Sequence, residues 1–135
     1  MKNKYAFSKK SLDKLKTCHR DLQTLAHEVM KLQLFDFGIA CGFRSKKDQE
    51  FAIQQGKSLL KEGKHNVSPS KAMDVFVVND GLIEWNNYPS WYMAIGVFIA
   101  VAKQLGIQIR CGADWDGDFD TRDQTFNDIG HIELI

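Results

Sequence analysis

Apolar residues recur at helical intervals in two long parts of the chain. Over residues 11–32 they form a single stripe, which predicts one amphipathic helix capped by Ser11. A denser apolar segment predicts a core helix over residues 90–105, and Gly106 directly after it is a typical C-cap. Both stripes indicate helices that pack against a common core.

A further helix is predicted between these two. Ser45 and Asp48 form a candidate capping box, so this helix is expected over residues 46–60. Gly56 falls inside the segment and weakens the prediction of a continuous helix, and Gly63 ends it.

Short runs of apolar and β-branched residues between the helices predict strands. The predicted strands are residues 37–41, 72–78, 107–111 and 132–135, the last of them opened by His131. The turn residues 79–81 follow the second strand. Helices and strands in this order predict one α+β domain over residues 1–135, with helices covering one side of a small, mainly antiparallel sheet.

Composition narrows the class of protein. The 135 residues are 44% hydrophobic and 26% charged with a net charge of +1, which is ordinary for a globular domain. No clustered basic face indicates a nucleic-acid partner, and the longest apolar run, residues 91–102, is too short to span a membrane. We expect a monomer that neither binds nucleic acid nor inserts into a membrane.

The cysteines and the N-terminus indicate the cellular compartment in which the protein is made. The cysteines Cys18, Cys41 and Cys111 are odd in number, so at least one thiol lies outside any intramolecular disulfide. A reducing compartment during synthesis is the simpler interpretation. The basic N-terminus has no apolar segment behind it, so no secretory signal is predicted.

Asp74 lies inside a predicted buried strand, where a carboxylate is costly unless a partner neutralises it. A metal ion is one such partner. With His65 upstream and His131 downstream, Asp74 completes a ligand set that leaves a fourth position on zinc open for water. The spacing alone also fits a simpler alternative, in which an arginine pairs with Asp74 and both histidines are structural.

Several short motifs occur in one order along nearly the whole chain. They are Gly42-Phe-Arg44-Ser with Gln49 in the following helix, His65-Asn-x-x-Pro-Ser-x-Ala-x-Asp74, Ile83-x-Trp85-Asn, Gly112-x-Asp-Trp115 and Asp128-x-x-His131-x-Glu. In this order they resemble the zinc peptidases of the D-alanyl-D-alanine carboxypeptidase and L-alanyl-D-glutamate endopeptidase family, above all its single-domain bacteriophage endolysins. The resemblance implies a fold like that of the hedgehog and D,D-peptidase domains.

One position departs from the family pattern. Many relatives place the first histidine seven residues before the aspartate, where this chain has Val67. Here His65 lies nine residues before Asp74, so the loop is expected to follow a longer path through Pro69. Some phage members share the His-Asn-x-x-Pro-Ser form, and His65 is therefore retained as the ligand.

The resemblance also implies a role for each site residue. His65, Asp74 and His131 are expected to bind Zn²⁺. Asp128 is expected to act as general base and to pass the proton to the leaving amine, with Gly130 providing the turn between Asp128 and His131.

Other side chains are expected to bind the substrate or to support a metal ligand. Arg44 is expected to hold the oxyanion or a substrate carboxylate, and Gln49 and Trp115 to contact substrate. Glu133 shares a strand face with His131 and is expected to support it. Without the resemblance, plain structural alternatives stay open: a turn aspartate at 128, a surface arginine at 44, an exposed glutamine at 49 and a core tryptophan at 115.

An acidic loop precedes the last strand, with alternating carboxylates at Asp114, Asp116, Asp118 and Asp120. The alternation resembles a Ca²⁺ loop, but the EF-hand pattern fails at Phe119 and Thr125. A solvated loop is therefore the favoured interpretation, with a Ca²⁺ site as the alternative.

From the resemblance we expect an endolysin, a zinc endopeptidase that cuts the L-alanyl-D-glutamate bond of peptidoglycan stem peptides during host lysis. Two alternatives stay open: D-alanyl-D-alanine carboxypeptidase activity on the same wall, and a non-catalytic, zinc-stabilised module that binds the wall. Without a predicted signal, the protein is expected in the host bacterial cytoplasm, reaching the wall after the membrane is permeabilised.

Overall fold

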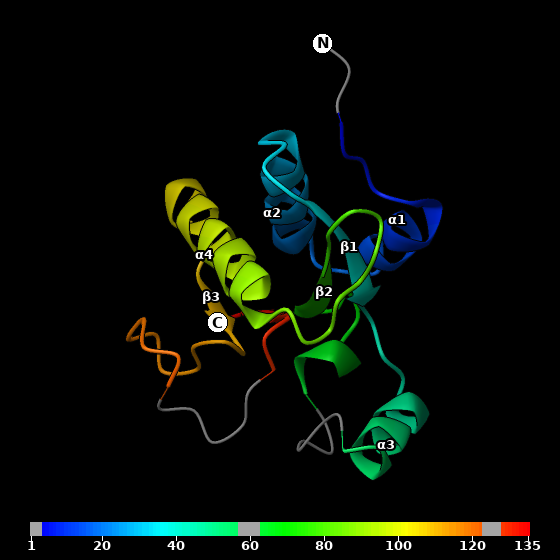
Figure 1. Ribbon diagram of the computed structural model, residues 1–135. Coiled ribbons are helices and arrows are strands. Elements are labelled where there is room, and N and C mark those ends of the chain that lie inside the picture. The colour runs from blue at the N-terminus through cyan, green and yellow to red at the C-terminus, as the bar shows by residue number, and fades with distance from the viewer. Residues whose placement is uncertain (1–3, 57–62, 123–127) are drawn as a thin grey trace.

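A computed structural model describes residues 4–56, 63–122 and 128–135. The elements of this described part are, in chain order, α1 (Lys9–Leu15), α2 (Arg20–Lys31), β1 (Asp36–Cys41), α3 (Lys46–Gln54), the 3-10 helix η1 (Lys64–Asn66), β2 (Ala72–Val78), α4 (Tyr88–Leu105), β3 (Ile109–Cys111) and β4 (His131–Leu134). Their arrangement is shown in Figure 1.

The strands form one four-stranded sheet in the order β1-β2-β4-β3, and each neighbouring pair is antiparallel. The last strand in the chain therefore lies between two strands that precede it. In its register with β2, His131 is the partner of Asp74. The predicted α+β fold with an antiparallel sheet is confirmed.

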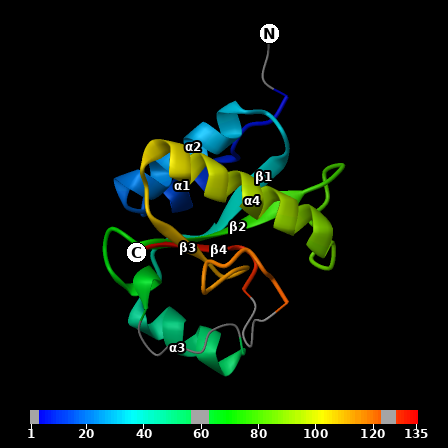
Figure 2. The ribbon, with the colours of Figure 1, turned by 90° about the vertical axis from the view of Figure 1, so that its left-hand side faces the viewer.

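Side chains alternate across the sheet and divide it into two faces. Met73 and Val75 of β2 and Ile132 of β4 join the hydrophobic core, on the side where α1, α2 and α4 lie (Figure 2). Asp74 and His131 alternate with these residues and so face the other side. There α3, η1 and the loop after β3 lie (Figure 2), so the predicted cover of one side only is wrong.

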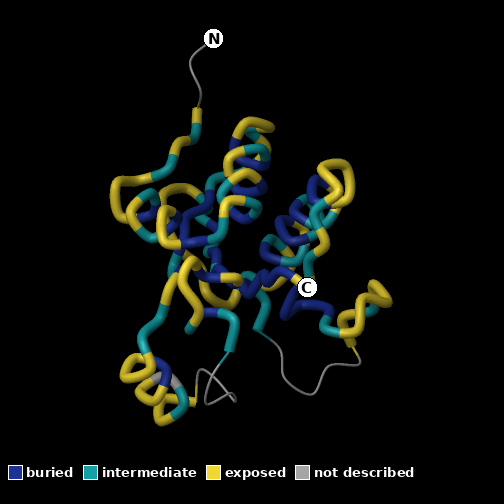
Figure 3. The backbone as a smooth tube through the Cα atoms, turned by 180° about the vertical axis from the view of Figure 1, so that it is seen from behind, coloured by how far each residue is buried: buried dark blue, intermediate teal, exposed yellow. Residues whose placement is uncertain are grey.

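The core fills the space between the sheet and the two longest helices. Leu22, Leu25 and Val29 of α2 pack there with Phe98 of α4, all at most 2% exposed. Figure 3 shows this buried backbone beside the sheet, whereas α3 is mostly exposed. None of the helices in the described ranges combines the length and apolar character that crossing a membrane requires.

The predicted single helix over residues 11–32 is wrong, because the chain forms α1 and α2 with a break between them. At the break the backbone pairs with the loop before β2: Ser70 donates its N–H to the Thr17 carbonyl at 2.8 Å, and His19 donates to the Ser70 carbonyl at 2.7 Å. His19 then caps α2, its Nδ1 accepting from the Asp21 N–H. Long-range pairing thus overrides a continuous apolar stripe.

Other predicted boundaries shift by a few residues. The helix capped by Ser45 ends at Gln54, since Gly56 adopts a φ of 70° that a helix cannot continue. The predicted helical residues 57–60 lie outside the described residues. The core helix begins earlier, at Tyr88, and ends at the predicted left-handed cap Gly106.

Candidate metal and catalytic site

The antiparallel pairing of β2 and β4 brings Asp74 and His131 side by side. They are register partners, and Nδ1 of His131 lies 3.0 Å from Oδ1 of Asp74. Both residues face away from the helix-covered core. A strand pair of this kind holds the two side chains on a rigid backbone, which favours a precise site.

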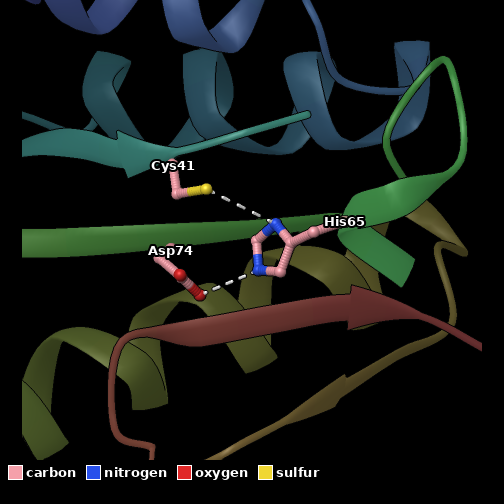
Figure 4. A group of neighbouring side chains, drawn as sticks. All are labelled: Cys41, His65 and Asp74. Atoms are coloured by element: carbon pink, nitrogen blue, oxygen red, sulfur yellow. Dashed lines mark hydrogen bonds and ion pairs between the residues drawn. The ribbon is translucent and has the colours of Figure 1, made fainter. Parts of the chain in front are cut away.

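The loop that carries His65 brings the second histidine to the same carboxylate. Arg44 donates its backbone N–H to the His65 carbonyl at 2.7 Å, which ties η1 to the segment after β1. The His65 ring is buried, with Nδ1 2.7 Å from the Gly42 carbonyl and Nε2 3.3 Å from Oδ1 of Asp74. Figure 4 shows the ring reaching towards Asp74 across β2.

The carboxylate of Asp74 thus accepts from both histidines through one oxygen. Burial raises the pKa of Asp74, but hydrogen bonds with His131 and His65 outweigh burial and hold the pKa far below its usual range. Burial lowers the pKa of each histidine, but the bond to Asp74 raises it to about 10 for His65 and about 9 for His131. A metal ion must therefore displace protons to enter this site.

In the described part of the chain, two of the groups of side chains that could hold a metal ion share Asp74. One is Cys41, His65 and Asp74, and the other is Asp74, Asp128 and His131, with the candidate ligand atoms of each group within 4.8 Å of one another. The predicted set of His65, Asp74 and His131 is divided between these two groups.

The distances to Asp74 suit zinc. With metal–ligand bonds of about 2.0–2.1 Å, neighbouring ligands of a tetrahedral zinc lie roughly 3.3 Å apart. The separations from Oδ1 of Asp74 are 3.3 Å to Nε2 of His65 and 3.0 Å to Nδ1 of His131. The other nitrogen of each ring faces an acceptor, the Gly42 carbonyl or Glu133, as metal-binding histidines usually do. The residues present therefore fit a metal ion.

Cys41 is a neighbour that the sequence did not single out. It is the register partner of Asp74 across β1 and β2, and its Sγ lies 3.8 Å from Nδ1 of His65 (Figure 4). That nitrogen lies much closer to the Gly42 carbonyl, at 2.7 Å, and so carries a proton. Nδ1 of His65 therefore does not accept the thiol proton; burial raises the pKa of Cys41, but its hydrogen bond with His65 outweighs burial and lowers that pKa. Only the pairing register, which the sequence does not give, would have revealed Cys41.

Asp128 lies beside the histidine of β4. Its Oδ2 is 3.8 Å from Nδ1 of His131, and its side chain is 35% exposed, so water reaches it. Burial, with Asp74 nearby, raises the pKa of Asp128 to about 6. The backbone fixes the position, because Asp128 donates its N–H to the Gly112 carbonyl at 3.3 Å and accepts from the His131 N–H at 3.0 Å. A carboxylate so placed is suited to proton transfer.

Arg44 and Gln49 form a pair at the edge of the site. Nη2 of Arg44 lies 3.5 Å from Oδ2 of Asp74, and Nη1 donates to Oε1 of Gln49 at 2.9 Å. Asp74 therefore contacts an arginine, as the structural alternative predicts, and also both histidines of the predicted ligand set. Gln49 is only 2% exposed, and its hydrogen bond holds the guanidinium of Arg44 in place. Contact of Gln49 with substrate stays a prediction.

Trp115 lies against the site. Its ring centroid is 5.3 Å from that of His131, at an interplanar angle of 42°, and the residue is half-buried. The side chain thus borders the metal-binding region and still meets solvent. Its predicted role as a substrate contact agrees with this position and stays a prediction.

The acidic loop after β3 also brings carboxylates together. Asp114, Asp116 and Asp118 offer oxygens within 4.8 Å of one another. Asp114 and Asp118 accept backbone N–H groups, from Phe119 and Asp120, both at 2.8 Å. These bonds are typical of a tight acidic turn with or without an ion, so the Ca²⁺ site stays a prediction.

Known proteins place this chain in a family. The sequence model of the phage L-alanyl-D-glutamate peptidase family matches residues 3–135. The L-alanyl-D-glutamate peptidase of Escherichia phage T5 is 32% identical over 135 residues, which span 97% of this chain and 98% of the relative. The crystal structure of the L-Ala D-Glu endopeptidase ChiX of Serratia marcescens has the same fold, with a TM-score of 0.80 and 21% identity over 99% of this chain and 92% of that chain. The chain belongs to the phage L-alanyl-D-glutamate peptidase family.

Proposed function

We propose that this chain is a zinc-dependent endopeptidase that cleaves the L-alanyl-D-glutamate bond of peptidoglycan stem peptides. The observation that carries the proposal is the convergence of two histidine nitrogens on Oδ1 of Asp74, at 3.3 and 3.0 Å, with Asp128 beside them. Membership of a peptidase family supports the same reaction.

In this proposal Nε2 of His65, the carboxylate of Asp74 and Nδ1 of His131 hold the zinc. These are the ring nitrogens that face Asp74, while the opposite nitrogens are held by the Gly42 carbonyl and by Glu133. Zinc, when bound, supplies a Lewis acid that polarises the scissile carbonyl and makes water a better nucleophile at neutral pH.

Asp128 is proposed to move the proton. It accepts a proton from the attacking water and gives it to the departing amine, so the amide bond breaks, the hydroxyl joins the alanine carbonyl carbon and the glutamate amine leaves neutral. The carboxylate is partly exposed to solvent, and the backbone hydrogen bonds of Asp128 hold it at the site.

Arg44 is proposed to hold negative charge on the substrate. Its guanidinium is anchored by Gln49 on one side and approaches Asp74 on the other, with its side chain 16% exposed. A fixed fork of donors suits the carboxylates of a stem peptide or the charge that develops on the scissile oxygen. Trp115 would then border the same substrate.

The proposed setting is that of a phage endolysin. The substrate is the wall of the host bacterium, and the protein is synthesised in the host cytoplasm and reaches the wall once the membrane is permeabilised. In this proposal the protein acts as a monomer and binds no nucleic acid.

The test is digestion of purified stem peptide, followed by mass spectrometry, with protein that is zinc-loaded, chelator-treated, or treated and resupplied with zinc. Cleavage between L-alanine and D-glutamate, lost with the chelator and restored by zinc, is the expected result. Loss of a terminal D-alanine instead would establish the carboxypeptidase alternative. Stoichiometric zinc with intact peptide would establish the non-catalytic wall-binding alternative.

A further inference from the structure

A line of three charged or polar side chains runs from the outer strand of the sheet to the site. Arg110 of β3 and Glu133 of β4 are register partners, and Nη2 of Arg110 donates to Oε2 of Glu133 at 2.9 Å. The other oxygen, Oε1, lies 2.9 Å from Nε2 of His131. Each oxygen of this carboxylate thus has its own donor.

The carboxylate and the imidazole ring of this line are buried, whereas the arginine is not. The side chain of Glu133 is 7% exposed, and that of His131 is 10% exposed, whereas Arg110 is 47% exposed. A buried carboxylate is costly unless it is paired and hydrogen-bonded. Glu133 meets both requirements, and so it can remain an acceptor beside the histidine.

We propose that Glu133 is a positioning residue that sets the orientation and proton position of His131, with Arg110 occupying the second carboxylate oxygen. This inference rests on the proposed function, since it concerns the nitrogen that would bind zinc. Because Glu133 is acceptor-only when ionised, it requires a proton on Nε2 of His131. A neutral ring then has its free lone pair on Nδ1, the atom that faces Asp74 at 3.0 Å.

The substitution Glu133→Gln tests this by changing the donors and acceptors while keeping the shape. Glutamine offers one acceptor oxygen to two donors. The guanidinium of Arg110 can only donate, so it competes for that oxygen. When the oxygen faces Arg110, the amide group faces Nε2 of His131, which must then accept and carry its proton on Nδ1. A ring in that state cannot bind metal through Nδ1.

The same reasoning predicts rescue by a second substitution. In Arg110→Met combined with Glu133→Gln, the competing donor is gone, so the amide oxygen is free to accept from Nε2 of His131. Arg110→Met alone is the matched control, because Glu133 keeps its bond to His131. A purely structural role of the ion pair predicts the opposite order, with the double variant at least as impaired as Glu133→Gln.

The experiment measures zinc affinity by competition with a chromophoric chelator and the ring Nε2–H of His131 by NMR in zinc-saturated protein. Thermal melting of the metal-free proteins separates loss of fold from loss of metal. We expect Glu133→Gln to weaken zinc by about 10–100-fold and to shift the Nε2–H signal, because zinc on Nδ1 keeps the proton on Nε2 while its charged acceptor is gone. The double variant should recover most of both, and Arg110→Met should change much less.

Equal zinc affinity in Glu133→Gln and wild-type protein would overturn the inference, as would a double variant weaker than Glu133→Gln. Both readouts use zinc alone, without substrate. If wild-type protein binds zinc but cuts no peptide, the proposed function fails while the positioning role of Glu133 is still decided. If wild-type protein binds no zinc at this site, both are overturned.

Discussion

Substituting Gly112 with alanine would displace Asp128 without altering any proposed metal ligand. A Cβ built at Gly112 would overlap the backbone carbonyl of Asp128 and meet its Cβ at 3.0 Å. Gly112 itself is held on β4, because it donates its N–H to the His131 carbonyl at 2.8 Å. The Asp128 side of the contact therefore has to move.

The size of the effect follows from the overlap. Relieving it requires a shift on the order of 1 Å, and a misplacement of that size costs about 10²-fold in rate, or roughly 2.7 kcal/mol of transition-state stabilisation. The overpacked contact should also destabilise the fold by about 1–3 kcal/mol. Zinc affinity should change far less than turnover, because the ring nitrogens of His65 and His131 keep their contacts with Gly42, Asp74 and Glu133.

The assay combines stem-peptide turnover, zinc competition and thermal melting of Gly112→Ala against wild-type protein. Gly96→Ala is the matched control, because Gly96 lies in α4 with nothing within 4 Å of an added Cβ. That control should keep full activity and gain about 0.5–1 kcal/mol in stability from the better helix former.

Wild-type turnover in Gly112→Ala would refute the reasoning, since it would mean that the position of Asp128 does not limit the reaction. Loss of zinc in proportion to loss of turnover would also refute it, because the displaced group would then be a metal ligand. Melting well below the assay temperature would be recognised in the thermal scan, and the comparison would then be repeated at a lower temperature.

Three further predictions follow from the site. Asp128→Asn should keep the fold and the zinc but lower turnover by about 10²–10⁴-fold, whereas Asp74→Asn should weaken zinc itself because an amide is a poorer ligand; equal zinc loss in both variants would contradict the assigned roles. Cys41→Ser should bind one zinc as wild-type protein does, measured by metal analysis, because the proposed ligands do not include the thiol; a vacant site would make Cys41 a ligand. If the acidic loop binds calcium, a calcium titration should change activity without displacing zinc. The double variant Asp116→Asn, Asp118→Asn should abolish that response. An activity that does not change with calcium in wild-type protein would contradict the Ca²⁺ site.

Local sequence patterns predicted the strands that carry the site. The β-branched run of β2 and the short strand opened by His131 lie where expected, since strand-forming residues and turn signals decide such elements locally. Asp74 was singled out because an acidic residue interrupts a buried strand. The candidate ligand set and the family resemblance both predict that His131 lies close to Asp74, and antiparallel pairing accounts for it physically.

What the sequence could not give depends on contacts between distant segments. The break before α2 results from backbone pairing with Ser70, which no property of residues 11–32 reveals. Cys41 lies beside Asp74 because of the register of β1 with β2. Gln49 belongs to the site because its Oε1 accepts a hydrogen bond from the guanidinium of Arg44. The same holds for Arg110, whose pairing with Glu133 requires β3 to lie next to β4.

The strand order has a consequence for how the protein folds. Strand β4 lies between β2 and β3, although both precede it in the chain, and Asp74 and His131 are separated by 57 residues. Such non-local pairings form late, because the intervening chain must be ordered before the contacts compensate for it. The strand that closes the sheet thus also completes the metal site. A partly folded chain in which β4 is undocked has Asp74 without His131, and metal binding and closure of the sheet stabilise one another.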